Sequence, residues 1–230
     1  METCKRSKIL LAVGFAVLTL LLTRGAPNAA ADTSSFCLSV PNTAISGYTG
    51  PYVCVLVDLT SSTTATITFT SQTDGSTFLM GDGSSVGLNV NATSFTYSAS
   101  GTNSLSGFTP GPYTNGGSGN VSDFGVFNLT VNDFDGFTHS ADEVVVSLTN
   151  TSGTWASASE VLIGNAGGNT AVAHIFICGD ADTNCTVSGG ALATGYASNG
   201  TQVPEPATLT LLGTGLLGLG VKLRKRYCKK

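Results

Sequence analysis

Short stretches in which apolar and polar residues alternate predict that most of this chain forms β-strands. In one such stretch, Phe127, Leu129 and Val131 fall on one face, whereas the polar Asn128 and Thr130 fall on the other. The pattern predicts strands over residues 36–40, 52–59, 65–70, 86–90, 94–98, 124–131, 144–149 and 171–178.

Turn-forming residues separate these strands, as in Asp74-Gly75, and no segment between the two terminal apolar runs has a helical period. Many short strands joined by Gly- and Asn-rich turns are typical of an all-β fold, an antiparallel β-sandwich or jelly roll. We expect this domain to cover residues 32–188, with a long loop at 101–120. The Gly- and Ser-containing segment 189–202 is expected to be a flexible linker.

The basic residues are confined to the two ends of the chain. The net charge of the whole chain is −4, but no Lys or Arg lies between Gly25 and Val221. Residues 32–202 contain twelve Asp and Glu residues and two histidines, so this part carries a charge near −12. Nucleic-acid binding needs cations at the phosphates and is therefore excluded, and anionic lipids are disfavoured. Cations, neutral sugars and other proteins are the partners that remain.

The N-terminus has the pattern of an export signal. Lys5, Arg6 and Lys8 precede an apolar run over residues 9–22, and three alanines follow at 29–31. A basic segment, an apolar run and a small-residue cleavage site in this order predict a signal peptide over residues 1–31 that is read by the Sec export machinery.

The C-terminal 28 residues, 203–230, combine three different segments. The motif Val203-Pro204-Glu205-Pro206 comes first, and its prolines favour an extended backbone that a protease can bind. An apolar run over 207–221 follows, about 22 Å long as a helix, which predicts a single short membrane-spanning helix. A basic tail over 222–230 ends the chain, and we expect it on the cytoplasmic side. Its cationic candidates include Lys222, Arg224, Lys225 and Arg226.

This order of segments resembles the PEP-CTERM sorting signal of Gram-negative bacterial surface proteins. The resemblance implies export, transient anchoring in the inner membrane, and processing by an exosortase near Pro204-Glu205-Pro206. It also implies a setting of exopolysaccharide production or biofilm at the cell surface or in the extracellular matrix. The alternative for the tail is an ordinary C-terminal membrane helix that is not processed.

The exported part contains four cysteines, Cys37, Cys54, Cys178 and Cys185. In an oxidising compartment they are expected to form disulfides, and four cysteines allow three pairings. Short loops close at lower entropic cost, which favours Cys37–Cys54 and Cys178–Cys185.

Two groups of acidic residues are candidates for cation binding. Asp180, Asp182 and Asn184 follow the alternating oxygen-ligand pattern with which a calcium loop begins, although the Gly and Glu that complete an EF-hand are missing. A weak structural Ca²⁺ site is the only cofactor hypothesis that follows. The second group comprises Asp133, Asp135, Asp142 and Glu143. Paired carboxylates also catalyse glycoside hydrolysis, so this group is a second, catalytic hypothesis as well.

Two further features are weighed against simpler interpretations. Gly83-Ser84-Ser85-Val86-Gly87 matches the G-x-S-x-G pattern of serine hydrolases, with His139 and His174 downstream, but strands rather than a helix follow it. We therefore expect a tight turn at Ser85 and assign no catalytic residue. Trp155 is a candidate for stacking on a sugar, although a core position is expected for a single aromatic residue.

The sequence thus predicts an exported, non-catalytic protein of the cell surface or matrix. A carbohydrate-binding module or adhesin is the alternative, and a secreted hydrolase is the third hypothesis. An exposed row of aromatic residues would favour the alternative, and a histidine within hydrogen-bond reach of Ser85 would favour the third.

Overall fold

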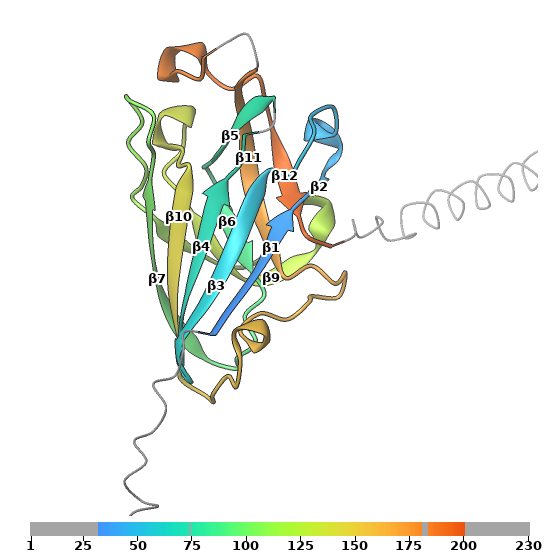
Figure 1. Cartoon of the computed structure of the whole chain (residues 1–230), viewed down its shortest axis with the longest axis vertical. Helices are drawn as coiled ribbons and strands as arrows, with labels where there is room; N and C mark the ends of the chain where they lie inside the picture. Colours follow the sequence, from blue (N-terminus) through green and yellow to red (C-terminus); the bar gives the residue numbers. More distant parts are fainter. Residues whose placement is uncertain (1–31, 74, 181–183, 201–230) are drawn as a thin grey trace, which may run out of the picture. The chain divides into compact units, whose positions relative to one another are not determined.

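The computed structural model describes residues 32–73, 75–180 and 184–200. This part of the chain is all-β, with antiparallel strands and no α-helix, which confirms the predicted fold class (Figure 1). The strands are β1 (Asp32–Leu38), β2 (Val40–Pro41), β3 (Val53–Ser61), β4 (Thr64–Ser71), β5 (Ser76–Met80), β6 (Val86–Leu88), β7 (Phe95–Thr102), β8 (Thr114–Asn120), β9 (Val126–Asn132), β10 (Glu143–Asn150), β11 (Ala171–Asp180) and β12 (Ala193–Ser198). Short 3-10 helices lie at η1 (Thr43–Ile45), η2 (Ser122–Phe124), η3 (Phe137–His139), η4 (Ala158–Glu160) and η5 (Val187–Gly189).

The strands form two sheets. The first has the order β1-β3-β4-β10-β7, and these five strands lie side by side in Figure 1. The second has the order β2-β12-β11-β6-β9-β8, and β5 also pairs with β11. The two sheets enclose a common core, so the described residues form a β-sandwich. The finer assignment to a jelly roll remains a prediction.

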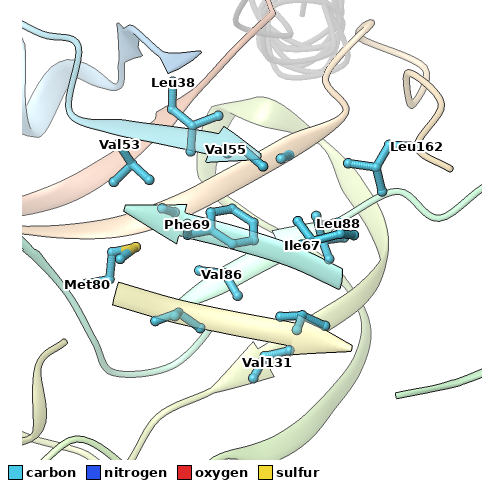
Figure 2. Packing of buried hydrophobic residues seen from close by; sticks show 14 of the residues in the cluster. Leu38, Val53, Val55, Ile67, Phe69, Met80, Val86, Leu88, Val131 and Leu162 are labelled. Carbon is cyan, nitrogen blue, oxygen red and sulfur yellow. The ribbon is translucent and has the colours of Figure 1, made fainter. Parts of the chain in front are cut away.

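The core follows from the alternation in the sequence. On β4, Ile67 and Phe69 are fully buried, and on the neighbouring β10 they pair with Val146 and Val144. The second sheet contributes residues such as Val86 to the same cluster (Figure 2). Full burial of an apolar side chain of this size contributes about 1.5–3 kcal/mol, so this shared cluster holds the two sheets together.

The second sheet is covered on both faces along β11. Ile175 and Ile177 point into the shared core, whereas Phe176 and Cys178 belong to a separate cluster on the outer face. Phe108, from the segment between β7 and β8, and Phe137 of η3 pack on that outer cluster. Burial on both faces explains why β11 reads as a continuous apolar run rather than an alternating one.

Three expectations about the chain's organisation are corrected by the structure. The segment 189–202 is not simply a linker, because its residues 193–198 form β12 and pair with β11. The sandwich therefore extends beyond residue 188. The segment 101–120 is not one long loop, because it holds the end of β7 and all of β8. The strand β5 was not predicted at all.

Candidate functional site

Both expected disulfides are present. Cys37 on β1 is bonded to Cys54 on the adjacent strand β3, and Cys178 on β11 is bonded to Cys185. The first bond closes a sequence separation of 17 residues. In the chain-entropy view, a crosslink that closes a loop of this length stabilises the folded state by about 3 kcal/mol.

The acidic loop between β9 and β10, residues 133–142, does not gather its carboxylates at one point. The Asp133 side chain is buried, and its Oδ1 accepts hydrogen bonds from the N–H groups of Gly111 and Phe134, both at 2.7 Å. Asp142 turns instead to Ser104, whose N–H donates to Oδ2 at 2.8 Å and whose hydroxyl also donates to it. Backbone N–H groups thus satisfy these carboxylates in a domain that lacks Lys and Arg.

The burial of Asp133 has an electrostatic consequence. Burial raises the pKa of the Asp133 carboxyl above its ordinary value, although the two N–H donors act in the opposite direction. The Tyr113 hydroxyl lies close to this carboxyl, and its interaction with Asp133 also acts to lower the pKa of Asp133. Burial, followed by the negative charge of Asp133, raises the pKa of Tyr113 as well. The two shifts have a common first cause, because burial makes the charged form of each group costly.

A hollow of about 360 Å³ lies at the start of β10, and its lining includes Ser104, Asp142 and Glu143. We call it the acidic hollow. Its two carboxylates come from adjacent residues, and no group of three or more His, Cys, Asp or Glu side chains suited to a metal occurs among the described residues. Of the predicted calcium ligands, Asn184 is exposed, while Asp182 and the side chain of Asp180 lie outside the described part.

Ser85 does not lie at a strand-to-helix elbow. It lies between β5 and β6, both of which pair with β11, so the segment 81–85 interrupts one edge of that strand. The Ser85 hydroxyl is buried and has no hydrogen-bond partner. The backbone N–H of His174 donates to the Ser85 carbonyl at 3.0 Å, but the imidazole does not reach the hydroxyl. The geometry that a nucleophilic serine requires is therefore missing here.

The two histidines have separate surroundings. His174 stacks on Tyr196 with ring centres 4.4 Å apart, and its Nε2 lies 2.7 Å from the Thr194 hydroxyl. Burial lowers the pKa of His174, which favours the neutral ring. His139 lies in the acidic loop, where its Nδ1 is 2.8 Å from the Thr109 carbonyl oxygen. Neither histidine side chain is hydrogen-bonded to the Ser85 hydroxyl.

A second hollow, of about 450 Å³, lies at the opposite end of β10 and is lined without any charged residue. We call it the amide groove, after the side chains of Asn89, Asn91, Asn128 and Asn150 that line it. Trp155 lies beneath it as a core residue with 2% exposure, as expected, and its Nε1 donates to the Asn91 carbonyl at 2.8 Å.

Sequence reasoning missed the amide groove. Asn89 and Asn91 follow β6, Asn150 ends β10 and Asn128 lies within β9, and because Asn is also an ordinary turn residue, their presence gave no separate signal. What the sequence lacks is information on which turns meet. Residues 89–93, 128 and 150–154 are far apart in the chain and come together only through the strand order of the sandwich.

The sorting candidates Val203 to Pro206, the apolar run 207–221 and the basic residues after it lie outside the described residues, as does the segment 1–31. Among the residues that are described, no helix is long and apolar enough to cross a membrane.

Comparison with known proteins gives one result for this chain. No curated protein and no solved structure matches it at a significant level. Residues 202–226 match the sequence model of the PEP-CTERM protein-sorting motif. The matched residues contain the Pro-Glu-Pro motif, the apolar run and the cationic residues Lys222 to Arg226 in the predicted order. The chain therefore carries a PEP-CTERM sorting motif at its C-terminal end, which marks it as a protein sorted by an exosortase.

Proposed function

We propose that this protein is an exported, non-catalytic component of the cell surface or extracellular matrix that is linked to exopolysaccharide. The observation that carries the proposal is the PEP-CTERM motif at residues 202–226. This motif implies export and membrane-anchored transit on the exosortase pathway. The signal peptide at residues 1–31 and the inner-membrane stage belong to the same proposal, because a C-terminal sorting signal acts only after export.

The described domain supports a role outside the cell. It carries two disulfides, which form and persist in oxidising compartments. Its lack of Lys and Arg between residues 25 and 221 argues against a nucleic-acid partner. The Ser85 hydroxyl has no base within reach, and the carboxylates of Asp133 and Asp142 are taken up by backbone donors. These contacts favour a structural or binding role over hydrolysis.

The proposal is tested by intact-mass analysis of the protein recovered from the surface of the native host. We expect a mature N-terminus near Asp32 and a C-terminus near Pro204-Glu205-Pro206, with the basic tail absent. A variant in which Pro204, Glu205 and Pro206 are all replaced by Ala should stay in the inner membrane at full C-terminal length. Surface protein that still ends in Lys229-Lys230 would contradict exosortase processing and leave simple anchoring.

A matched control separates the motif from general damage to the tail. Replacing Thr208 and Thr210, which lie in the apolar run but outside the Pro-Glu-Pro motif, by Ala keeps the length and apolar character of that run. This variant should be processed like the native chain. If both variants were retained equally, the tail would act only as a membrane segment.

The second candidate function is that of a carbohydrate-binding module or adhesin. The observation that favours it is the charge-free amide groove, because amides and hydroxyls are the groups that bind neutral sugars. The outer-face aromatic residues of the second sheet do not add to it, because Phe108 and Phe176 are buried in their own cluster.

A further inference from the structure

The amide groove has a polar lining whose hydrogen-bonding groups are only half used. The Nδ2 of Asn89 donates to the Ile163 carbonyl at 3.0 Å, and the Nδ2 of Asn91 donates to the Glu160 carbonyl at 2.9 Å. Because each amide nitrogen is held by a backbone carbonyl, the orientation of each amide is fixed. The two Oδ1 atoms form no hydrogen bond with the described residues and remain as acceptors.

Asn150 presents the complementary group. Its Oδ1 accepts from the N–H of Ser152 at 3.0 Å and from the hydroxyl of the same residue at 3.2 Å. Its Nδ2 forms no hydrogen bond with the described residues, although the side chain as a whole is only 6% exposed. This nitrogen is not one of the fully buried atoms without a partner, so it opens to the groove that Asn150 lines and is available to donate to a bound molecule.

The floor of the groove holds these groups in place. Asn128 pairs with both backbone groups of Val90, accepting from its N–H and donating to its carbonyl, each at 2.8 Å. The side chain thereby replaces a neighbouring strand for that residue. The Trp155 indole holds Asn91 from below through its carbonyl. Groups that are already ordered lose little entropy when a ligand binds.

We propose that the amide groove binds a segment of a neutral polysaccharide. Sugar hydroxyls donate and accept hydrogen bonds, so they match acceptors at Asn89 and Asn91 and a donor at Asn150. Ile163 is 51% exposed at the rim and offers an apolar surface to the C–H face of a sugar ring. The proposal rests on the proposed surface role, because that role places the groove next to exopolysaccharide.

The charge of the domain decides against an acidic polysaccharide. The groove contains no cation to pair with a uronate or sulfate group, and residues 32–202 carry twelve acids without Lys or Arg. An anionic chain would therefore be repelled by the domain and would find no compensating contact. With no aromatic platform in its lining, the groove should bind weakly, with a Kd of roughly millimolar order for one short segment.

The test uses the full-length chain in a detergent without a sugar headgroup, such as a polyoxyethylene ether. The probe is the host's own surface polysaccharide, separated by anion exchange into a neutral and an acidic fraction. Affinity electrophoresis should show retardation by the neutral fraction and at least tenfold weaker retardation by the acidic one. Equal or stronger binding to the acidic fraction, or no binding to either, would overturn the proposal.

The groove itself is tested with Asn150→Asp. This change keeps the oxygen that accepts from Ser152 and replaces only the unpaired Nδ2, and we expect at least tenfold weaker binding. Asn115→Asp is the matched control, because the Asn115 Oδ1 accepts from the N–H of Gly117 at 2.7 Å in the same local arrangement, outside the groove. Equal binding by the two variants would move the ligand elsewhere.

A second pair keeps the test decisive if Asn150→Asp does not fold. Ile163→Asp should weaken binding about tenfold, whereas Leu192→Asp, at a residue of similar exposure outside the groove, should not. Because these measurements do not involve sorting, a negative result here would not contradict the proposal that the protein is processed by an exosortase and reaches the surface. Failure of processing, in turn, would leave the binding result unaffected.

Discussion

The two ends of β10 differ in the polar groups that surround them. At Glu143, where the strand begins, the acidic hollow contains carboxylates, and Asp142 is held by the N–H and hydroxyl of Ser104. At Asn150, roughly 24 Å further along the strand, the amide groove contains no charge at all. One strand of eight residues thus connects a charged surface to a neutral one.

The difference shows how a domain without Lys or Arg distributes its polar chemistry. Carboxylates need strong partners, and here backbone N–H groups supply them at Asp82, Asp133, Asp142 and Glu160. Those carboxylates hold loops in place. An uncharged amide can be held through its nitrogen alone, as at Asn89 and Asn91, which leaves its oxygen available to a ligand. The acidic end therefore uses its carboxylates to hold loops, whereas the neutral end leaves amide groups available, which supports the binding that we propose there.

Removing the support of the neutral end should have the largest effect. Trp155→Ala deletes a buried side chain beneath the amide groove together with its hydrogen bond to Asn91, so we expect a loss of about 3–5 kcal/mol in the free energy of unfolding. The loss is measured by far-UV circular dichroism in urea. Tryptophan fluorescence cannot be used, because Trp155 is the one Trp of the chain and the variants lack it. Trp155→Phe should cost clearly less. Equal losses in the two variants would mean that packing contributes nothing there.

Removing the Asn128 amide, which pairs with the backbone of Val90, should have the second-largest effect on stability. Asn128→Ala leaves the N–H of the buried Val90 without a partner, while its carbonyl still accepts from the Ala92 N–H, so the free energy of unfolding should fall by roughly 1–3 kcal/mol and glycan binding should weaken. Asn115→Ala removes an exposed amide and should cost well under this amount. A loss at Asn128 no greater than at Asn115 would show that the groove floor is not held as described.

Calcium should act at carboxylates of the domain and not at the amide groove, which contains none. We expect millimolar Ca²⁺ to raise the melting temperature more than NaCl of equal ionic strength, because screening alone makes the two salts equivalent. At a calcium concentration about five times the Kd, a site in the folded state adds about 1 kcal/mol, or a few degrees. Asp180→Ala with Asp182→Ala should abolish the excess. Equal shifts in the two salts would reject the site, and an unchanged response in the double variant would place it elsewhere.

The smallest effect should be a change of pH dependence at Asp133. Because burial raises its pKa in the folded state, the folded protein holds this proton more tightly than the unfolded chain does. The contribution of Asp133 to stability is thus fully present below the unfolded pKa, about 3.9, and is lost as the pH rises through the folded pKa. Asp133→Asn keeps the acceptor for Gly111 and Phe134 and should remove that loss.

The measurement is urea unfolding of both proteins at a series of pH values above 3.9. The difference in free energy of unfolding should shift in favour of Asp133→Asn as the pH rises. Asp135→Asn, at an exposed carboxylate of the same loop, is the control. A shift in the reverse direction would mean that the two N–H donors outweigh burial.

Strands that bury one face could be predicted from the sequence, and strands stabilised in other ways could not. The alternation in β4 and β9 identified them because each has one core face. By contrast, β5 is buried on both sides, with Phe78 in the shared core and Leu79 in the outer cluster, so it has no period to detect. The strand β8, TNGGSGN, has no apolar residue and exists through its backbone pairing with β9.

The sequence by itself determined the fold class and the sorting motif, because these depend on local periodicity and on a contiguous pattern. Its short spacings favoured one of the three possible disulfide pairings, which the structure shows to be the one formed. The sequence also determined that the exported domain has no Lys or Arg with which to pair its acids. Only the tertiary structure decided which donors replace those cations and where the neutral amides gather. Both outcomes depend on turns separated by tens of residues, such as Asn91 and Asn150, and strand pairing alone brings them together.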